Sequence, residues 1–212
     1  MFLPLFFCWA AGDPNPPQGA RSKSLSFWYC VHCDKWLCSP PGSAFSFARR
    51  EVRHLVEPLV VSWGWNREDG AGMESRPTRF VEEKEWQGTR DPAAYLSVPA
   101  AIQFQAEHDW PRVRAERHEL LREARRRIEE VTGLPPTCPD SPEWYAQMAA
   151  FPLPPCDAAA LQRRLYDEYR VEVPVIEWGG RQLVRVSVQG YNAREDVETL
   201  IRALRDLLLY AR

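Results

Sequence analysis

One run of the sequence, from Pro111 to Val131, constrains the fold more than any other. Apolar residues recur along it at steps of three and four, at Val113, Leu120, Leu121, Ala124, Ile128 and Val131. On an α-helix this spacing places them on one stripe. The remaining positions, "RAERHE" and "REARRRIEE", are typical of a solvated helix surface with i,i+4 ion pairs. Because such a helix must bury its stripe against a second layer, the chain should contain a packed domain.

The rest of the C-terminal half can supply that layer. A last helix is predicted from Asn192 to Tyr210, with Asn192 as N-cap, Glu195 three residues on, and a stripe at Val197, Leu200, Ile201, Leu204 and Leu208. Shorter helices are expected over 142–148 and 157–169. Two strands, over 171–176 and 183–188, flank a Gly179-Gly180 hairpin turn. We therefore predict a small α+β domain over 111–212, in which helices cover one face of a short antiparallel sheet.

The region before this domain is less regular. The stretch "SAFSFARRE" predicts a short strand with Phe45 and Phe47 on one face, and "LVEPLVVSWGW" is strongly apolar. Asp91-Pro92 is typical of a helix start, and Pro99 should kink or split the helix that follows. Residues 1–28, which include "GDPNPPQGARSKSLS", are expected to be irregular. Strands and helices alternate, so the class is mixed α/β.

Charge and cysteine usage restrict the partners and the compartment. The 212 residues include 27 basic and 29 acidic side chains, a net charge of -2, which lacks the basic footprint of a nucleic-acid binder. The opening "MFLPLFFCWAAG" has no basic residue before its apolar run, and it is well short of the roughly 20 apolar residues that span a bilayer. We therefore expect no nucleic acid, no membrane and no secretion. The six cysteines are scattered rather than densely paired, which favours free thiols in a cytoplasmic protein.

A cluster of possible metal ligands lies near the start of the chain. Cys30, Cys33 and Cys38 surround His32, so zinc is conceivable from the ligand types alone. A closed zinc site needs a fourth ligand and usually a second, well-spaced pair, and neither follows in the sequence. The alternative is that these cysteines are small apolar side chains. We expect no metal, but a small zinc-binding protein remains an open alternative.

Lys35 lies between the same cysteines, just ahead of the apolar run "WLCSPPGSAF". We expect it on a loop that leads into the strand containing Phe45 and Phe47. A partly desolvated amine has a lowered pKa, which is what covalent catalysis through a lysine requires. Most lysines are solvated surface groups, so the residues alone leave the role of Lys35 open.

Several long strings of the sequence resemble one enzyme family. The stretch "DKWLCSPPGSAFSFARRE…LVEPLVVSWGW" is similar to the segment around the cofactor lysine of class V aminotransferases, in the isopenicillin N epimerase-like branch. In the same order, "EWQGTRDPAAYLSVPAAIQFQAEHDWPRVR" resembles the family's Gly-Thr loop and following helix. "VRVSVQGYNAREDVETLIRAL" resembles its C-terminal arginine, Tyr-Asn turn and last helix. The resemblance runs from about Tyr29 to the C-terminus.

The resemblance implies a cofactor and a set of roles. The family uses pyridoxal 5'-phosphate (PLP) on an amino acid or small peptide, by epimerisation, transamination or carbon–sulfur cleavage, and works as a homodimer. Lys35 falls on the lysine that binds PLP covalently and moves the proton of the substrate's α-carbon. Gly88 and Thr89 fall on the loop that reaches the cofactor phosphate across the dimer interface. Arg185 falls on the arginine that takes the substrate carboxylate, a role suited to a bidentate donor.

Departures from the family pattern put the activity in doubt. His usually precedes the lysine, whereas Asp34 stands here, and a carboxylate is repelled by a phosphate. The family's ring-stacking group, its carboxylate for the pyridine nitrogen and its phosphate-binding helix lie upstream, and only 34 residues precede Lys35.

We therefore interpret 29–110 as the end of the large PLP-binding domain and 111–212 as the small domain. The chain should bind PLP weakly and have no useful turnover. We also expect apolar surface around Trp36, Trp63 and Trp65. A non-catalytic interaction protein remains the other alternative.

Overall fold

The computed structural model describes residues 28–62, 64–65 and 78–209. The chain divides into two compact units, with the boundary between Ala106 and Glu107. None of the described helices is both long enough and apolar enough to cross a membrane.

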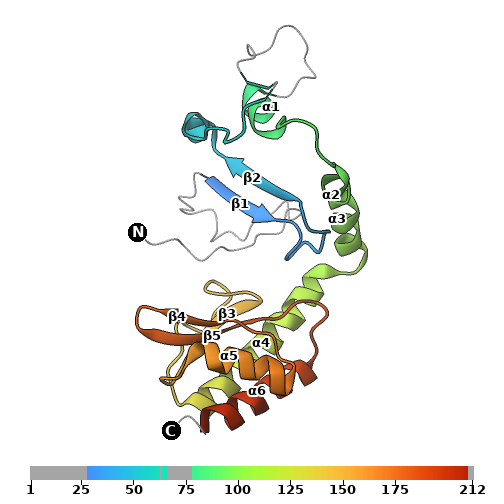
Figure 1. Ribbon diagram of the computed structural model, residues 1–212. Coiled ribbons are helices and arrows are strands. Elements are labelled where there is room, and N and C mark those ends of the chain that lie inside the picture. Colours follow the sequence, from blue (N-terminus) through green and yellow to red (C-terminus); the bar gives the residue numbers. More distant parts are fainter. Residues whose placement is uncertain (1–27, 63, 66–77, 210–212) are drawn as a thin grey trace. The chain divides into compact units, whose positions relative to one another are not determined.

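The C-terminal unit is a three-stranded antiparallel sheet with helices on one face (Figure 1). Its helices are α4 (Trp110–Thr132), α5 (Ala158–Tyr169) and α6 (Arg194–Leu209). Its strands, β3 (Met148–Leu153), β4 (Val175–Trp178) and β5 (Arg181–Ser187), are ordered β3-β5-β4. The two long predicted helices and the layered arrangement are therefore confirmed.

The predicted stripes form the core of this unit. Leu121 and Ala124 of α4, Leu204 of α6 and Val184 of β5 are fully buried. The core also takes in Phe151 of β3 and Leu165 of α5. Alternation along β5 sends Val184 and Val186 towards the helices, while Arg185 and Ser187 are exposed. The sheet thus has one covered and one open face.

Three details of the prediction for this unit were wrong. Residues 142–148 form only a short turn before β3, because the chain there pairs with β5 from Met148 onward. The first strand of the hairpin begins at Val175 rather than 171, although the Gly179-Gly180 turn joins the strands as predicted, with φ of 57° and 74°. The last helix begins at Arg194, so Ala193 rather than Asn192 is its N-cap residue, and Asp196 rather than Glu195 accepts the hydrogen bond from the Ala193 backbone N–H, at 3.0 Å.

The charge run of α4 is only partly a solvated surface. Arg127 and Glu123 form an i,i+4 pair at 3.8 Å, as expected. Arg125, however, is buried, and donates to the Cys138 carbonyl at 2.7 Å and to Glu129 at 3.0 Å. This arginine fastens the segment that follows α4 back onto the helix.

The same segment is held by a second group of polar contacts. Asp140 accepts hydrogen bonds from Arg122, including Nε to Oδ1 at 3.0 Å and Nη2 to Oδ2 at 2.9 Å, and another from the Tyr145 hydroxyl. These bonds, first from Arg122 and then from Tyr145, lower the pKa of Asp140 to about 2. Burial first, and then the bond to Asp140, raises the pKa of Tyr145 to about 12.

The N-terminal unit is built from short elements. Strands β1 (Trp28–His32) and β2 (Ala44–Ala48) form an antiparallel hairpin, followed by the 3-10 helix η2 (Arg50–Leu55). The helices α1 (Arg79–Glu85), α2 (Ala93–Leu96) and α3 (Val98–Glu107) complete it. Strand β2 and the split near Pro99 were predicted, but β1 was not.

The packing inside this unit is sparse. Cys33 and Ala48 are the only apolar side chains classed as buried among its described residues. Polar and close backbone contacts tie the segments together instead. Arg53 donates to the Ala48 carbonyl at 3.2 Å, and Gly64 comes so close to α1 that a Cβ there would lie 2.1 Å from the Glu82 oxygen. The described residues of this unit form no hydrophobic core comparable to that of the C-terminal unit.

Apolar surface was expected around three tryptophans of this unit. Trp65 is exposed, Trp36 is half-buried, and Trp63 lies outside the described residues.

Candidate functional site

Lys35 lies on the loop that joins β1 to β2, as expected. The base of this loop is closed by hydrogen bonds, from the Cys33 amide to the Ser43 carbonyl at 3.0 Å and from the Ser39 amide to the Cys33 carbonyl at 3.1 Å. The Ser39 and Ser43 hydroxyls meet at 3.0 Å, and both residues are buried. From α3, the Gln105 amide donates to the Trp36 carbonyl at 3.0 Å. The backbone on both sides of Lys35 is thus fixed.

The side chain of Lys35 is exposed. The partial desolvation expected for its amine is therefore wrong, because the buried part of the loop is its base and Lys35 lies at the turn. An accessible primary amine can still react with an aldehyde to form a covalent bond. The loop presents this amine to solvent from a well-braced backbone.

Asp34, the residue that departs from the family pattern, lies near His32, the last residue of β1. Its Oδ1 lies 3.7 Å from Nδ1 of His32, and its side chain is 24% exposed against 68% for His32. When His32 is protonated, this pair offsets part of the negative charge that Asp34 places beside Lys35.

The Gly88-Thr89 loop lies between α1 and α2. Gly88 has φ of 107°, a conformation that L side chains rarely adopt, so a glycine is required there. Arg90 fastens the loop by donating to the Glu85 carbonyl and to Gln87, each at 2.9 Å, and its guanidinium stacks over the Tyr95 ring at 4.7 Å. Thr89 is exposed at this bend, so its hydroxyl is available to a phosphate.

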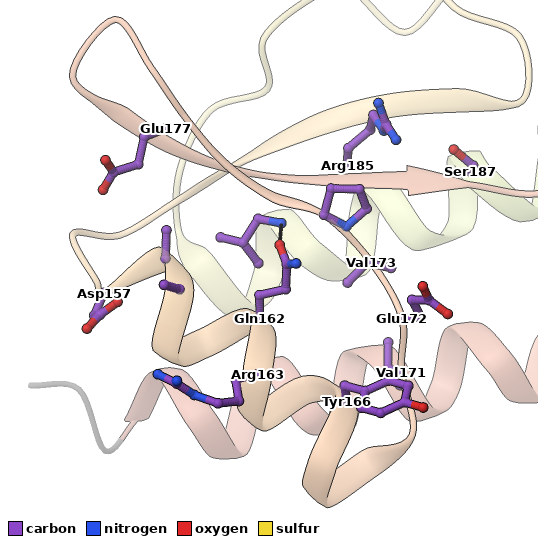
Figure 2. Close-up of a pocket in the computed structure, with 14 residues that line it drawn as sticks. Asp157, Gln162, Arg163, Tyr166, Val171, Glu172, Val173, Glu177, Arg185 and Ser187 are labelled. Carbon is purple, nitrogen blue, oxygen red and sulfur yellow. Dashed lines mark hydrogen bonds between the residues drawn. The ribbon is translucent and has the colours of Figure 1, made fainter.

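Arg185 lies at an open groove of the C-terminal unit with a volume of about 1120 Å³. Figure 2 shows its side chain rising from β5 on the side away from the helices. Among the residues that line the groove, Gln162 of α5 accepts from the Val175 amide at 2.8 Å (Figure 2). The Arg185 amide donates to the Pro174 carbonyl at 3.0 Å. Sequence reasoning identified the arginine but not the groove, because α5, β5 and residues 171–175 meet only in the fold.

The groove carries charges of both signs. Besides Arg185 it is lined by Arg163, Asp157, Glu172 and Glu177, while Val171, Val173 and Pro174 add apolar surface. Such a lining can accept a ligand that has a carboxylate and an ammonium group, as amino acids do.

The predicted site residues come from separate segments. Lys35 and Thr89 belong to the N-terminal unit but lie on different connections, and no hydrogen bond between their side chains is present in the described part of the chain. Arg185 belongs to the C-terminal unit. Their functional groups fit PLP and its substrate in part. The Lys35 amine can react with the PLP aldehyde, and the Thr89 hydroxyl can donate to the PLP phosphate. The Arg185 guanidinium can pair with the carboxylate of an amino acid.

The cysteines do not support the zinc alternative. Cys33 is buried beneath the loop, whereas Cys30 and Cys38 are exposed. Among the described residues, no three His, Cys, Asp or Glu side chains are grouped closely enough to hold a metal ion.

Comparison with known proteins gives both a family and a fold. No family model matches the chain. An isopenicillin N epimerase from Amycolatopsis lactamdurans is 37% identical over 186 residues, which are 85% of this chain and 46% of that protein. The chain thus spans about half the length of the curated relatives it matches, in their C-terminal part. The resemblance to class V aminotransferases, in the isopenicillin N epimerase-like branch, is confirmed for this part.

Solved structures agree on the fold. A cysteine desulfurase from Thermococcus onnurineus superposes with a TM-score of 0.67 at 19% identity, over 87% of this chain and 47% of that chain. A C-DES mutant, solved with glycine covalently linked to its PLP cofactor, superposes with a TM-score of 0.58 at 18% identity, over 84% of this chain and 46% of that chain. The fold is that of the corresponding half of PLP-dependent enzymes.

Proposed function

We propose that this chain contributes the lysine, the phosphate-binding threonine and the substrate arginine of a PLP-dependent enzyme, and that by itself it binds PLP weakly and has no useful turnover. The observation that carries the proposal is the relation to isopenicillin N epimerase together with an accessible Lys35 on a braced hairpin loop. PLP, when bound, supplies an electron sink for the α-carbon of an amino acid.

Each residue has a definite part in this proposal. Lys35 binds the cofactor covalently and holds or moves the α-proton, because its amine is the basic group of the loop. Thr89 donates its hydroxyl to the phosphate, and Arg185 pairs with the substrate carboxylate. The substrate is an amino acid or a small peptide, and the working enzyme is a cytoplasmic homodimer once the rest of the cofactor site is supplied.

The weak PLP binding and low turnover that we propose for the single chain follow from the interactions that these three residues do not provide. Lys35, Thr89 and Arg185 provide neither a stacked ring nor a carboxylate for the pyridine nitrogen, and preorganised groups of that kind provide much of the rate enhancement. Asp34 adds a negative charge near the PLP phosphate, and the repulsion between the two weakens cofactor binding.

Borohydride trapping tests this proposal directly. The sequence has three lysines, Lys23, Lys35 and Lys84. We expect incubation with excess PLP, reduction and peptide mapping to place the label on Lys35. Lys35→Ala should abolish the absorbance of the adduct, and Asp34→His should strengthen it. Lys84→Ala is the matched control, because Lys84 lies on α1 beside Glu83 at 3.4 Å. Equal labelling of all three lysines, or tight binding with turnover in the unmodified chain, would contradict the proposal.

A further inference from the structure

One buried donor of the C-terminal unit has no hydrogen-bond acceptor. It is Nε of Arg117, which lies on α4, and it is the only buried side-chain nitrogen or oxygen without a partner in the part of the chain that the structure describes. A guanidinium stays protonated in proteins and can only donate. Buried donors without an acceptor are rare in folded proteins, and a bound ion or water is one explanation for them. An acceptor for Arg117 therefore has to come from outside the described chain.

Arg117 is also one of the residues that line a second groove, with a volume of about 360 Å³. The groove lies on α4 beside Arg194, the first residue of α6, and the two helices contact each other. Its other lining residues are Glu116, Glu119, Leu120, Glu123 and Arg126. None of these residues lines the groove at Arg185, so the two grooves are separate.

The carboxylates of this second groove are already paired. Each of its three glutamates lies beside an arginine, in the pairs Glu116–Arg112 at 3.7 Å, Glu119–Arg122 at 3.1 Å and Glu123–Arg194 at 3.0 Å. Arg117 and Arg126, by contrast, form no ion pair with another described residue. These two arginines of the groove therefore lack the anionic partners that the neighbouring arginines have.

We propose that the second groove binds a small oxyanion of the phosphate class, held by Arg117 and Arg126. A planar guanidinium donates two parallel hydrogen bonds to phosphate oxygens. A phosphate has enough negative charge and acceptor oxygens to engage two arginines at once. Arg194, which pairs with Glu123 at the same groove, adds a third cation. The inference goes beyond the proposed function, because none of the residues that line this groove takes part in it.

A bound water is a poorer explanation than an oxyanion. A water can accept a hydrogen bond from Nε of Arg117, but it supplies no negative charge to a guanidinium that is itself partly buried. Because a buried charge is far more costly than a buried neutral donor, a ligand that supplies both an acceptor and a counter-charge fits this position better.

Titration calorimetry of the full chain with inorganic phosphate, at neutral pH and without PLP, tests the site. We expect this groove to bind one phosphate per chain, and we expect the affinity to fall as sodium chloride is added. The melting temperature should rise with phosphate concentration, because a ligand of the folded state stabilises that state by mass action. Succinate, which carries its two charges on separate carboxylates, should bind more weakly at the same ionic strength.

Arg117→Met gives the decisive comparison, because methionine keeps much of the apolar stem and removes the guanidinium. Phosphate affinity should fall at least about tenfold, since charge-assisted hydrogen bonds are lost. Without phosphate, the variant should be at least as stable as the unmodified chain, because a buried donor without an acceptor has been removed. An arginine with only a structural role would instead destabilise the chain when replaced.

A second variant and a matched control complete the test. Arg126 is exposed, so Arg126→Gln should keep the circular dichroism of the unmodified chain while it weakens phosphate binding. Arg163→Gln replaces an exposed arginine of the groove at Arg185 and should leave phosphate binding unchanged.

Three results would overturn the inference. The first is no phosphate binding by the unmodified chain, and the second is binding that both Arg117→Met and Arg126→Gln leave unchanged, which would place the phosphate elsewhere. The third is succinate binding as tight as phosphate binding, which would assign the groove to carboxylates. PLP trapping at Lys35 is measured separately, so failure of the phosphate site and failure of the proposed cofactor chemistry are distinguishable.

Discussion

Asp140 connects protonation to the stability of the C-terminal unit. Hydrogen bonds from Arg122 and Tyr145 hold its folded-state pKa near 2, below its ordinary 3.8. A group with a depressed pKa contributes stability that is present above its unfolded pKa and lost as the pH falls through its folded pKa. We therefore expect this contribution to be complete at neutral pH and to disappear between about pH 4 and pH 2.

The variant Asp140→Asn tests this linkage. At pH 7 it should lower the free energy of unfolding by about 1 kcal/mol, a low value for a charged hydrogen bond because the carboxylate is one-third exposed. Thermal melts from pH 7 to pH 2 should converge on those of the unmodified chain. Asp167→Asn on the exposed face of α5 is the control; an equal effect there, or a difference that does not shrink in acid, would contradict the assignment.

Tyr145 should make the stability of the C-terminal unit depend on pH in the alkaline range. Its folded-state pKa is raised to about 12, so its contribution is complete below its ordinary value of 10 and is lost as the pH rises through 12. We expect Tyr145→Phe to destabilise the chain by about 1 kcal/mol below pH 10. The difference from the unmodified chain should decrease in alkali, as followed by chemical denaturation.

At the scale of elements, the core between α4 and α6 should be the most sensitive part of the described fold. Leu204 is fully buried, so Leu204→Ala should cost about 2–5 kcal/mol of unfolding free energy. The same change at Leu59, which is fully exposed, should remain within about 0.5 kcal/mol in the free chain. Urea denaturation of both variants checks this pair, and equal losses would mean that Leu59 is buried in solution.

The elements also show how far the sequence could predict the structure. Long periodic stripes identified α4 and α6, and Asp157 marked the start of α5, where it accepts from the Ala160 amide at 2.9 Å. Strand β3 was missed because "MAAFPL" contains alanines and Pro152, which argue against a strand. The proline is tolerated because β3 is an edge strand, paired on one side only.

The candidate site was less predictable than the fold. The position of Lys35 on a loop followed from the turn residues and the strand after it, but its exposure depends on what packs on that loop. The groove at Arg185 depends on contacts between residues 11 and 13 positions apart, namely that of Arg185 in β5 with Pro174 and that of Gln162 with Val175 in β4. Local sequence patterns do not predict such contacts.

At the scale of the whole molecule, the two units should differ in their ability to fold alone. The C-terminal unit contains nearly all the buried apolar side chains of the described chain, whereas the N-terminal unit contains two. We expect residues 107–212, expressed alone, to unfold cooperatively, and residues 1–106 alone to show no cooperative transition. Calorimetry of the two fragments checks this, and a cooperative transition in 1–106 would mean that the apolar side chains exposed on this unit are covered within the fragment.

The Gly179-Gly180 turn has a consequence for the rate of folding. Because the turn fixes the register of β4 on β5, this hairpin can close on a timescale of roughly microseconds, before any distant contact forms. Strand β5 is central, so early closure leaves its other edge ready for β3, about 30 residues away in the sequence. Replacing Gly180, whose φ is 74°, by a residue that resists this conformation should therefore slow refolding, and not only lower the stability reached at the end.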